Sequence, residues 1–149
     1  MKSIRAILSG QDTATVDRRI PVAEAARLMA ARHVGALPIS DGDEVVGIFT
    51  ERDALNRIVA AGVDPARTPI GDVMSTTLVV ADIDETYETC LDRMRRAHIR
   101  HLIVLDHGRM AGVVSMRDLM AVDLDEKDEA LTLLNAYVHD VPPTLGKRL

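Results

Sequence analysis

Two short segments of the sequence share the pattern Gly-x-x-Ser/Thr-x-x-Asp. The first runs from Gly47 to Asp53 as GIFTERD, and the second runs from Gly112 to Asp118 as GVVSMRD. In both segments an arginine stands directly before the aspartate. A hydroxyl, a guanidinium and a carboxylate at the start of a helix can serve the helix itself or a bound ligand. The pattern therefore has two interpretations.

The simpler interpretation is a capping box at each helix start. Thr50 and Ser115 would cap the two helices, and the aspartate three residues after each cap would accept a hydrogen bond from the cap backbone. This interpretation gives no reason for the glycine before each cap or for the arginine after it.

The second interpretation is a site for a phosphorylated nucleoside. A helix N-terminus attracts phosphate because its first amides are unpaired and carry partial positive charge. A neighbouring carboxylate can accept hydrogen bonds from ribose hydroxyls, as in dinucleotide-binding folds. Arg52 and Arg117 would add bidentate contacts to phosphate, and the glycine would let a ligand approach the strand closely. Capping and ligand binding can use the same residues.

Both segments lie inside a longer internal repeat. Residues 32–53 align without a gap on residues 97–118, at a constant offset of 65 residues. Identical residues within these ranges are His33/His98, Leu37/Leu102, Asp41/Asp106, Gly47/Gly112, Arg52/Arg117 and Asp53/Asp118. Such a repeat indicates that one supersecondary unit has been duplicated.

The hydrophobic pattern predicts the order β-α-β-β-α for each unit. The predicted helices begin near Pro21 and Thr86, and the predicted strand pairs cover 36–39 with 45–49 and 102–105 with 110–114. A further helix follows each pair, over 51–61 and after Ser115, and short strands at Val16 and 78–81 precede the first helices. A unit of about 60 residues buries too little surface alone, so we expect the two units to pack sheet against sheet.

A third region begins near Asp123 with the charge run DLDEKDE, which is typical of a solvated helix start. Leu131, Leu133, Leu134 and Val138 then predict a short amphipathic helix that ends before Pro142. We therefore predict an α/β (α+β) fold with repeats over 1–68 and 69–122 and a C-terminal helical extension and tail over 123–149.

The composition excludes several function classes. Only 2% of the 149 residues are aromatic and the net charge is −5, which argues against a nucleic-acid partner. The sole cysteine, Cys90, cannot form an internal disulfide, and no apolar run approaches the length of a membrane span. The N-terminal residues carry no signal-peptide cleavage pattern. We expect a cytoplasmic protein without a membrane partner.

The remaining reactive residue types predict neither catalysis nor a metal site. No cysteine or carboxylate completes a recognisable ligand spacing around the histidines, and His33 and His98 occupy matching positions that favour a structural role near a helix end. Cys90 lies on an apolar stripe, which is typical of a buried thiol. The sequence contains none of the common hydrolase, metalloprotease or P-loop motifs.

The paired units resemble a tandem CBS-domain pair, the Bateman module, of the stand-alone bacterial or archaeal type. The resemblance rests on GALPI…GIFTERD and IRHLIVLD…GVVSMRD and extends from Ile4 to Val122. It implies a pseudo-symmetric module with two clefts for adenosine-containing ligands. Such modules commonly dimerise into a flat disc and act as sensors, not catalysts.

The resemblance also assigns nucleotide-binding positions. Asp53 and Asp118 match the family's ribose-binding aspartates, and Thr50 and Ser115 match its hydroxyl residues beside the ribose and phosphate. Ile48 and Val113 match strand positions that line the nucleotide. The adenine pocket comes from the opposite repeat, which gives Ala14 and Val34 for the Asp118 site and Val79 and Ile99 for the Asp53 site.

Two basic residues complete this set. Arg100 and His101 fall where the family places phosphate contacts near the centre of the module, whereas the first repeat has Gly35 and Ala36 at the equivalent positions. The two clefts should therefore be unequal, because the second repeat alone supplies this phosphate-binding edge.

We predict a non-catalytic regulatory module that binds AMP, ADP, ATP or NAD(H), with S-adenosylmethionine derivatives as further candidates and no metal. We also expect a homodimer and an unidentified regulated protein. The alternative is a structural dimerisation or partner-interaction module with empty clefts, whose contact would be Ala130 to Val138. An enzyme is a third alternative, for which the sequence offers no general base or metal cluster.

Overall fold

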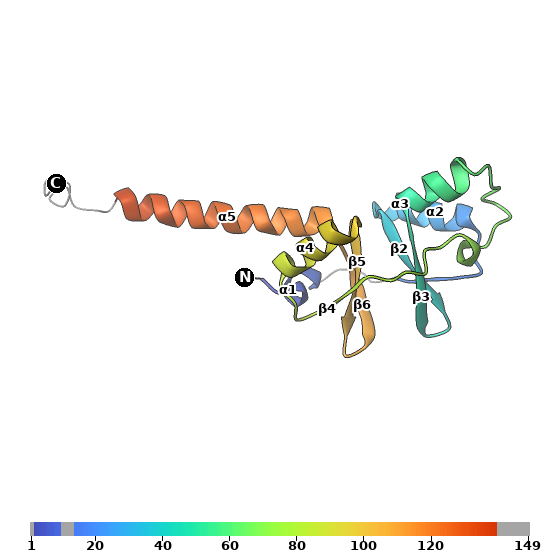
Figure 1. Cartoon of the computed structure of the whole chain (residues 1–149), viewed down its shortest axis with the longest axis horizontal. Coiled ribbons are helices and arrows are strands. Elements are labelled where there is room, and N and C mark those ends of the chain that lie inside the picture. The colour runs from blue at the N-terminus through green and yellow to red at the C-terminus, as the bar shows by residue number, and fades with distance from the viewer. Residues whose placement is uncertain (1, 10–13, 140–149) are drawn as a thin grey trace, which may run out of the picture.

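The computed structural model describes residues 2–9 and 14–139 of the chain. Two three-stranded sheets lie next to each other, and both hairpins point the same way with helices at their other end (Figure 1). The elements are α1 (Ile4–Leu8), β1 (Val16–Asp17), α2 (Val22–Arg32), β2 (Ala36–Asp41), β3 (Glu44–Thr50), α3 (Glu51–Asp53), η1 (Ala54–Val59), η2 (Ile70–Asp72), β4 (Val80–Asp82), α4 (Tyr87–Ala97), β5 (His101–Asp106), β6 (Arg109–Ser115) and α5 (Met116–His139).

The two halves have the same topology, which confirms the predicted β-α-β-β-α repeat. In each sheet the short first strand pairs in parallel with the middle strand, and the middle strand forms an antiparallel hairpin with the third. Ile103 pairs with Val113 just as Pro38 pairs with Ile48, so the loss of the proline in the second repeat leaves the register unchanged.

Each half has its own apolar core, and a third cluster joins them. Ala36 and Ile48 of the first half pack with Ile103 of the second, and all three are buried. The two sheets therefore share a core, as expected for units that are too small to be stable alone.

The segment before each repeat packs into the core of the other half. Ile4 of α1 is fully buried in the second half's core, and Ile70 of η2 is fully buried in the first half's core. Equivalent hydrogen bonds hold the two segments, from Ile4 N to Glu85 O at 2.9 Å and from Ile70 N to Ile20 O at 2.8 Å. The start of the expected 1–68 repeat thus belongs structurally to the second half.

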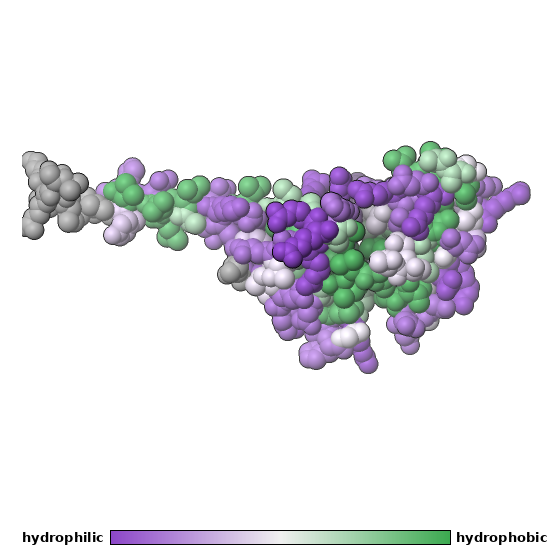
Figure 2. Space-filling view, in the orientation of Figure 1, coloured by the Kyte–Doolittle hydropathy of each residue, from purple (hydrophilic) through white to green (hydrophobic). Residues whose placement is uncertain are grey.

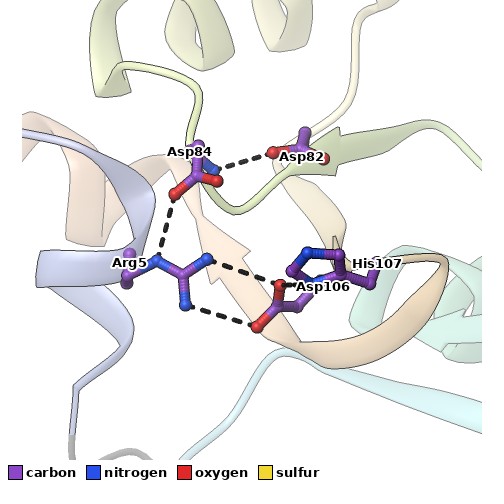
Figure 3. Close-up of polar contacts among 5 residues, drawn as sticks. All are labelled: Arg5, Asp82, Asp84, Asp106 and His107. Carbon is purple, nitrogen blue, oxygen red and sulfur yellow. Dashed lines mark hydrogen bonds and ion pairs between the residues drawn. The ribbon is translucent and has the colours of Figure 1, made fainter.

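A cluster of charged residues fixes α1 on the second half (Figure 3). The Arg5 Nε donates to Asp84 Oδ1 at 3.0 Å, and its two terminal nitrogens lie 3.3 and 3.4 Å from the carboxylate oxygens of Asp106. These hydrogen bonds from Arg5 hold the pKa of Asp106 below its ordinary value, and a bond to His107 adds to the effect. The equivalent carboxylate of the first half, Asp41, instead pairs with arginines of its own half.

The C-terminal region differs from the expected arrangement, because α5 is one helix and has no break at Asp123. The charge run stays helical, with Lys127 Nζ 2.8 Å from Asp123 Oδ2 one turn away. The buried Tyr87 hydroxyl of α4 donates to Glu126 at 2.8 Å, which ties this part of α5 to the second half. The expected stop at Pro142 lies outside the described residues. Within 2–9 and 14–139, no helix is long and apolar enough to cross a membrane.

Candidate functional site

Both predicted capping boxes are present. Thr50 Oγ1 accepts a hydrogen bond from Asp53 N at 3.2 Å, and Asp53 Oδ2 accepts one from Thr50 N at 3.0 Å. Ser115 and Asp118 repeat the pattern at 3.1 and 3.2 Å. Each aspartate uses only Oδ2 in its cap, so the capping role and a second role for Oδ1 are compatible.

Each capping box borders a cleft that both halves line. We call these clefts the Asp118 cleft, with a volume of about 900 Å³, and the Asp53 cleft, with a volume of about 410 Å³. The predicted residues that line the Asp118 cleft are Ala14, Val34, Arg100, His101, Val113, Ser115, Arg117 and Asp118. Those that line the Asp53 cleft are Ile48, Thr50, Arg52, Asp53, Val79, Ile99, Arg100 and His101. Every predicted site residue thus borders a cleft, with the opposite-repeat residues on the expected side.

Arg100 and His101 form a wall that the two clefts share. A Cβ atom on Gly35 would lie 3.2 Å from two atoms of the His101 ring. A side chain at Gly35, the position equivalent to Arg100, would therefore require the imidazole of the second repeat to shift by a few tenths of an ångström. Arg100 and His101 of the second repeat thus border both clefts, and their expected role as phosphate contacts stays a prediction.

His101 is partly buried at this wall. Burial lowers its pKa because the charged imidazolium loses solvation, and the nearby Arg100 lowers it further. Glu51 and Asp118 act in the opposite direction. An additional negative group near the imidazole would raise its pKa.

The two clefts differ in the surroundings of their aspartates. Arg57 Nε lies 3.7 Å from Asp53 Oδ1, and the same guanidinium donates to Met74 O at 2.8 Å. The position equivalent to Arg57 in the second repeat is Val122. Oδ1 of Asp53, which takes no part in the cap, is thus near the Arg57 cation of its own repeat. Oδ1 of Asp118 has no equivalent cation from its own repeat, because Val122 replaces the arginine.

The charges that line the clefts differ as well. Three arginines and two carboxylates line the Asp118 cleft, and two of each line the Asp53 cleft. The additional arginine is Arg32 at the end of α2, which the sequence reasoning did not single out. It also missed Glu51, which borders both clefts and whose only signal was its place directly after a cap residue.

The linker between the halves, residues 73–79 between η2 and β4, is a further part of the Asp53 cleft that the sequence reasoning largely missed. Ser75 pairs with Ile48 of β3 through two backbone hydrogen bonds of 2.8 and 2.9 Å. This pairing brings Ser75, Thr77 and Leu78 to the cleft beside Val79. Only Val79 was predicted there.

The expectation that the motif glycine makes room for a ligand is wrong for Gly47. A Cβ atom there would collide with the sulfur of Met74 and lie 3.0 Å from Ser75 O. Gly47 therefore allows close packing of the linker against β3. Gly112, in contrast, borders the Asp118 cleft.

The remaining candidates have structural roles. His33 and His98 end α2 and α4 in the left-handed conformation, with φ of 55° and 54°. Cys90 is fully buried, and desolvation raises its thiol pKa to about 11, which disfavours the reactive thiolate. In the part of the chain that the structure describes, no group of His, Cys, Asp or Glu residues has an arrangement that could hold a metal ion.

Comparisons with known proteins identify the family. The family model described as "CBS domain" matches residues 4–60 and 70–125. The chain is 32% identical over 135 residues to the CBS domain-containing protein YhcV of Bacillus subtilis, and the match covers 91% of this chain and 95% of YhcV.

Solved structures agree with this match. A protein with CBS domains from Burkholderia ambifaria superposes with a TM-score of 0.79 at 29% identity, over 83% of this chain and 95% of that one. The CBS domain pair of MJ0100, solved with 5′-methylthioadenosine and S-adenosyl-L-methionine, shares the fold with a TM-score of 0.74 at 23% identity, over 85% and 98%. CBS-pair proteins are of the regulatory, signal-transduction type. The chain belongs to the CBS domain family and carries two CBS domains.

Proposed function

We propose that this chain is a non-catalytic regulatory module that binds an adenosine-containing ligand, such as AMP, ADP, ATP or NAD(H), in the clefts between its repeats. One observation carries the proposal. Asp53 and Asp118 both border a cleft while using a single carboxylate oxygen in their caps. A ribose presents two adjacent hydroxyls, and a carboxylate fixed in this way is a suitable acceptor for them.

The other cleft residues suit the remaining parts of such a ligand. Val34 and Val113 give the Asp118 cleft aliphatic walls for an adenine ring, and Val79 and Ile48 do the same for the Asp53 cleft. Phosphates would lie near the helix start and the basic wall of Arg100, where amide donors and a guanidinium favour negative charge. The ligands of MJ0100 contain adenosine, and this supports the same class here.

Thermal unfolding with a series of adenosine compounds tests the proposal. A ligand at 100 times its dissociation constant stabilises a protein by about 2.7 kcal/mol, so a clear rise in the melting temperature is expected for at least one compound. The matched control is the double variant Asp53→Asn/Asp118→Asn, since an asparagine oxygen still accepts the cap hydrogen bond. This variant should keep the melting temperature of the free protein and lose the ligand-induced rise. The proposal fails if no adenosine compound at millimolar concentration shifts the wild type, or if the double variant shifts equally.

We also propose that the module works as a homodimer that acts on a regulated partner protein, in a reducing compartment such as the cytoplasm. The support is the free, buried Cys90 and the exposed apolar side chains of α5. These side chains also favour the second candidate function, a partner-interaction module with empty clefts. The ligand series separates the two candidates, because the second one predicts no response to any nucleotide.

A further inference from the structure

The distal part of α5 extends away from the rest of the molecule (Figure 1). From Lys127 to His139 every side chain is exposed, yet apolar side chains lie along this stretch (Figure 2). Leu133 and Tyr137, for example, are 72% and 73% exposed. A helix of this length without packing partners is only marginally stable in water, so the extension needs a surface to pack against.

Five of the seven exposed large apolar residues of α5 lie on one side of the helix together with Lys127, whereas Leu133 and Tyr137 lie off this side. These five and Lys127 form what we call the α5 seam, whose members alternate in steps of four and three residues: Met120, Leu124, Lys127, Leu131, Leu134 and Val138. The five apolar members are 51 to 61% exposed. Alternating steps of four and three place residues on one side of the helix with the period of a left-handed coiled coil.

We propose that the α5 seam packs antiparallel against the α5 seam of a second copy of this chain. The inference rests on the proposed homodimer and assigns its contact surface. A two-fold axis near Glu129 brings Met120 opposite the partner's Val138 and Leu124 opposite the partner's Leu134. The same axis brings Lys127 opposite the partner's Leu131. Every seam residue then faces a seam residue, as a two-fold symmetric contact requires.

The charge distribution selects the antiparallel orientation. The proximal segment Asp123–Glu129 contains five carboxylates and one lysine, whereas 130–139 contains no Asp, Glu, Lys or Arg. An antiparallel pair sets the acidic segment of each helix against the uncharged segment of the other. A parallel pair would place the two acidic segments together and the two Lys127 ammonium groups across the seam, and both arrangements are repulsive.

Lys127 is compatible with its place in the seam. Its ammonium group is held at 2.8 Å by Asp123 of its own helix, and the side chain is 70% exposed. The aliphatic stem can therefore cover the partner's Leu131 while the charge stays in water.

The mass of the full-length chain in solution tests the contact, measured by analytical ultracentrifugation. We expect the wild type at twice 16.3 kDa and the variant Leu131→Glu/Leu134→Glu at 16.3 kDa. The matched control is Leu133→Glu, which adds a charge to the same exposed helix outside the seam and should remain dimeric. Dissociation of the control to the same extent would show that the seam does not define the interface.

Oxidative cross-linking tests the orientation. The variant with both Leu124→Cys and Leu134→Cys should form a disulfide-linked dimer, and neither single variant should. In the antiparallel pair, equal positions at residue 134 are separated by about 15 Å along the helix axis, too far for a disulfide. Cross-linking of the single variants would establish a parallel pair and overturn the proposal. The native Cys90 is buried and does not compete.

The outcomes also separate this inference from the proposed homodimer. A monomeric wild type at the highest concentration tested would refute both. A wild-type dimer that survives Leu131→Glu/Leu134→Glu would leave the homodimer intact and refute the seam as its contact. Nucleotide-induced stabilisation of the monomeric variant should equal that of the wild type, because the seam lies outside both clefts.

Discussion

Asp53 and Asp118 occupy equivalent positions in the two repeats but differ in what surrounds them. Both accept a cap hydrogen bond, at 3.0 and 3.2 Å. Arg57 lies near the free oxygen of Asp53, whereas the second repeat has Val122 at that position. The capping aspartate is thus the same in both repeats, whereas the residue near its second carboxylate oxygen is Arg57 in the first repeat and Val122 in the second. If an adenosine compound binds as proposed, we expect the Asp118 carboxylate to be the better acceptor for it.

The basic residues extend this difference. The Asp118 cleft is larger and has Arg32 in addition to Arg100 and its motif arginine, whereas the Asp53 cleft has one arginine fewer for the same number of carboxylates. A ligand with several phosphates should therefore prefer the Asp118 cleft. A smaller or less charged adenosine compound suits the Asp53 cleft.

The largest expected effect comes from removing the charge of each aspartate separately. Asp118→Asn should weaken the tighter site for ADP by about 30-fold, which corresponds to about 2 kcal/mol for two lost charge-assisted hydrogen bonds. Asp53→Asn should weaken the other site by less, because Arg57 already competes for that carboxylate. Calorimetric titration of both variants measures the two sites. An equal loss in both would show that the clefts are functionally alike.

Removal of the shared basic wall should affect both clefts. Arg100→Ala is expected to weaken ADP binding at both sites by about tenfold, the effect of one lost contact between charged groups. Adenosine, which lacks phosphate, should bind to this variant as it does to the wild type. A loss of ADP affinity in only one cleft would show that Arg100 does not contact phosphate in both.

Replacement of Arg57 should make the clefts more alike. Arg57→Leu leaves the free Asp53 oxygen without its nearby cation, so adenosine should bind the Asp53 cleft more tightly, by about threefold. The variant also loses the hydrogen bonds to the linker carbonyls of Val73 and Met74. The free energy of unfolding should therefore fall by about 1 kcal/mol in urea titrations. Unchanged binding would show that Arg57 only anchors the linker.

The smallest expected effect is a pH dependence through His101. Its pKa is lowered by burial in the free protein, and a bound phosphate should raise it, so the complex takes up a proton. AMP binding should therefore tighten about twofold more in the wild type than in His101→Gln between about pH 7.5 and pH 6, near the ordinary histidine pKa. The phosphate of AMP also titrates in this pH range, but it does so equally in both measurements. The difference in affinity change between wild type and His101→Gln therefore reports on His101 alone. Parallel pH profiles would exclude His101 as a phosphate contact.

Acidification should strengthen AMP binding through His101 but should lower the stability of the free protein through the same residue. Because the folded-state pKa of His101 lies below the unfolded value, the unfolded chain binds the proton first as the pH falls. The free energy of unfolding should consequently decrease on acidification through the ordinary histidine range, and His101→Gln should remove this contribution. Urea titrations at several pH values measure it.

The hydrophobic pattern predicts the topology and the hairpins, the Ser/Thr-x-x-Asp motif predicts both capping boxes, and the constant offset indicates that the two units are copies. The residues from the two halves that meet across each cleft were predicted by resemblance to a family, since no local pattern reveals a contact between distant strands. The place of the His101 ring above Gly35 illustrates this point. From the sequence, the glycine at position 35, opposite Arg100 in the alignment, predicted only that the two clefts differ.

Two features escaped prediction for physical reasons. The exchanged isoleucines Ile4 and Ile70 are separated by 66 residues, one more than the offset of the repeat, so the gap-free alignment did not pair them. The continuity of α5 was missed because a run of charged residues suggests a helix start, whereas intrahelical pairing and the hydroxyl of Tyr87 stabilise it as a helix interior.

The burial of Ile4 in the core of the second half has a consequence for the order of folding. During synthesis α1 is the first helix to be made, yet the core that receives it is complete only after β6 and the start of α5 have followed. The buried core of the first half, in contrast, comes entirely from residues 16–74, so it is complete before the second half has been made. A chain cut in the linker after Met74 would leave Ile70 with the first half but would deprive the second half of the fully buried Ile4. Because α1 packs into the second half and Ala36, Ile48 and Ile103 form a buried cluster across both halves, the two repeats should unfold in a single cooperative transition.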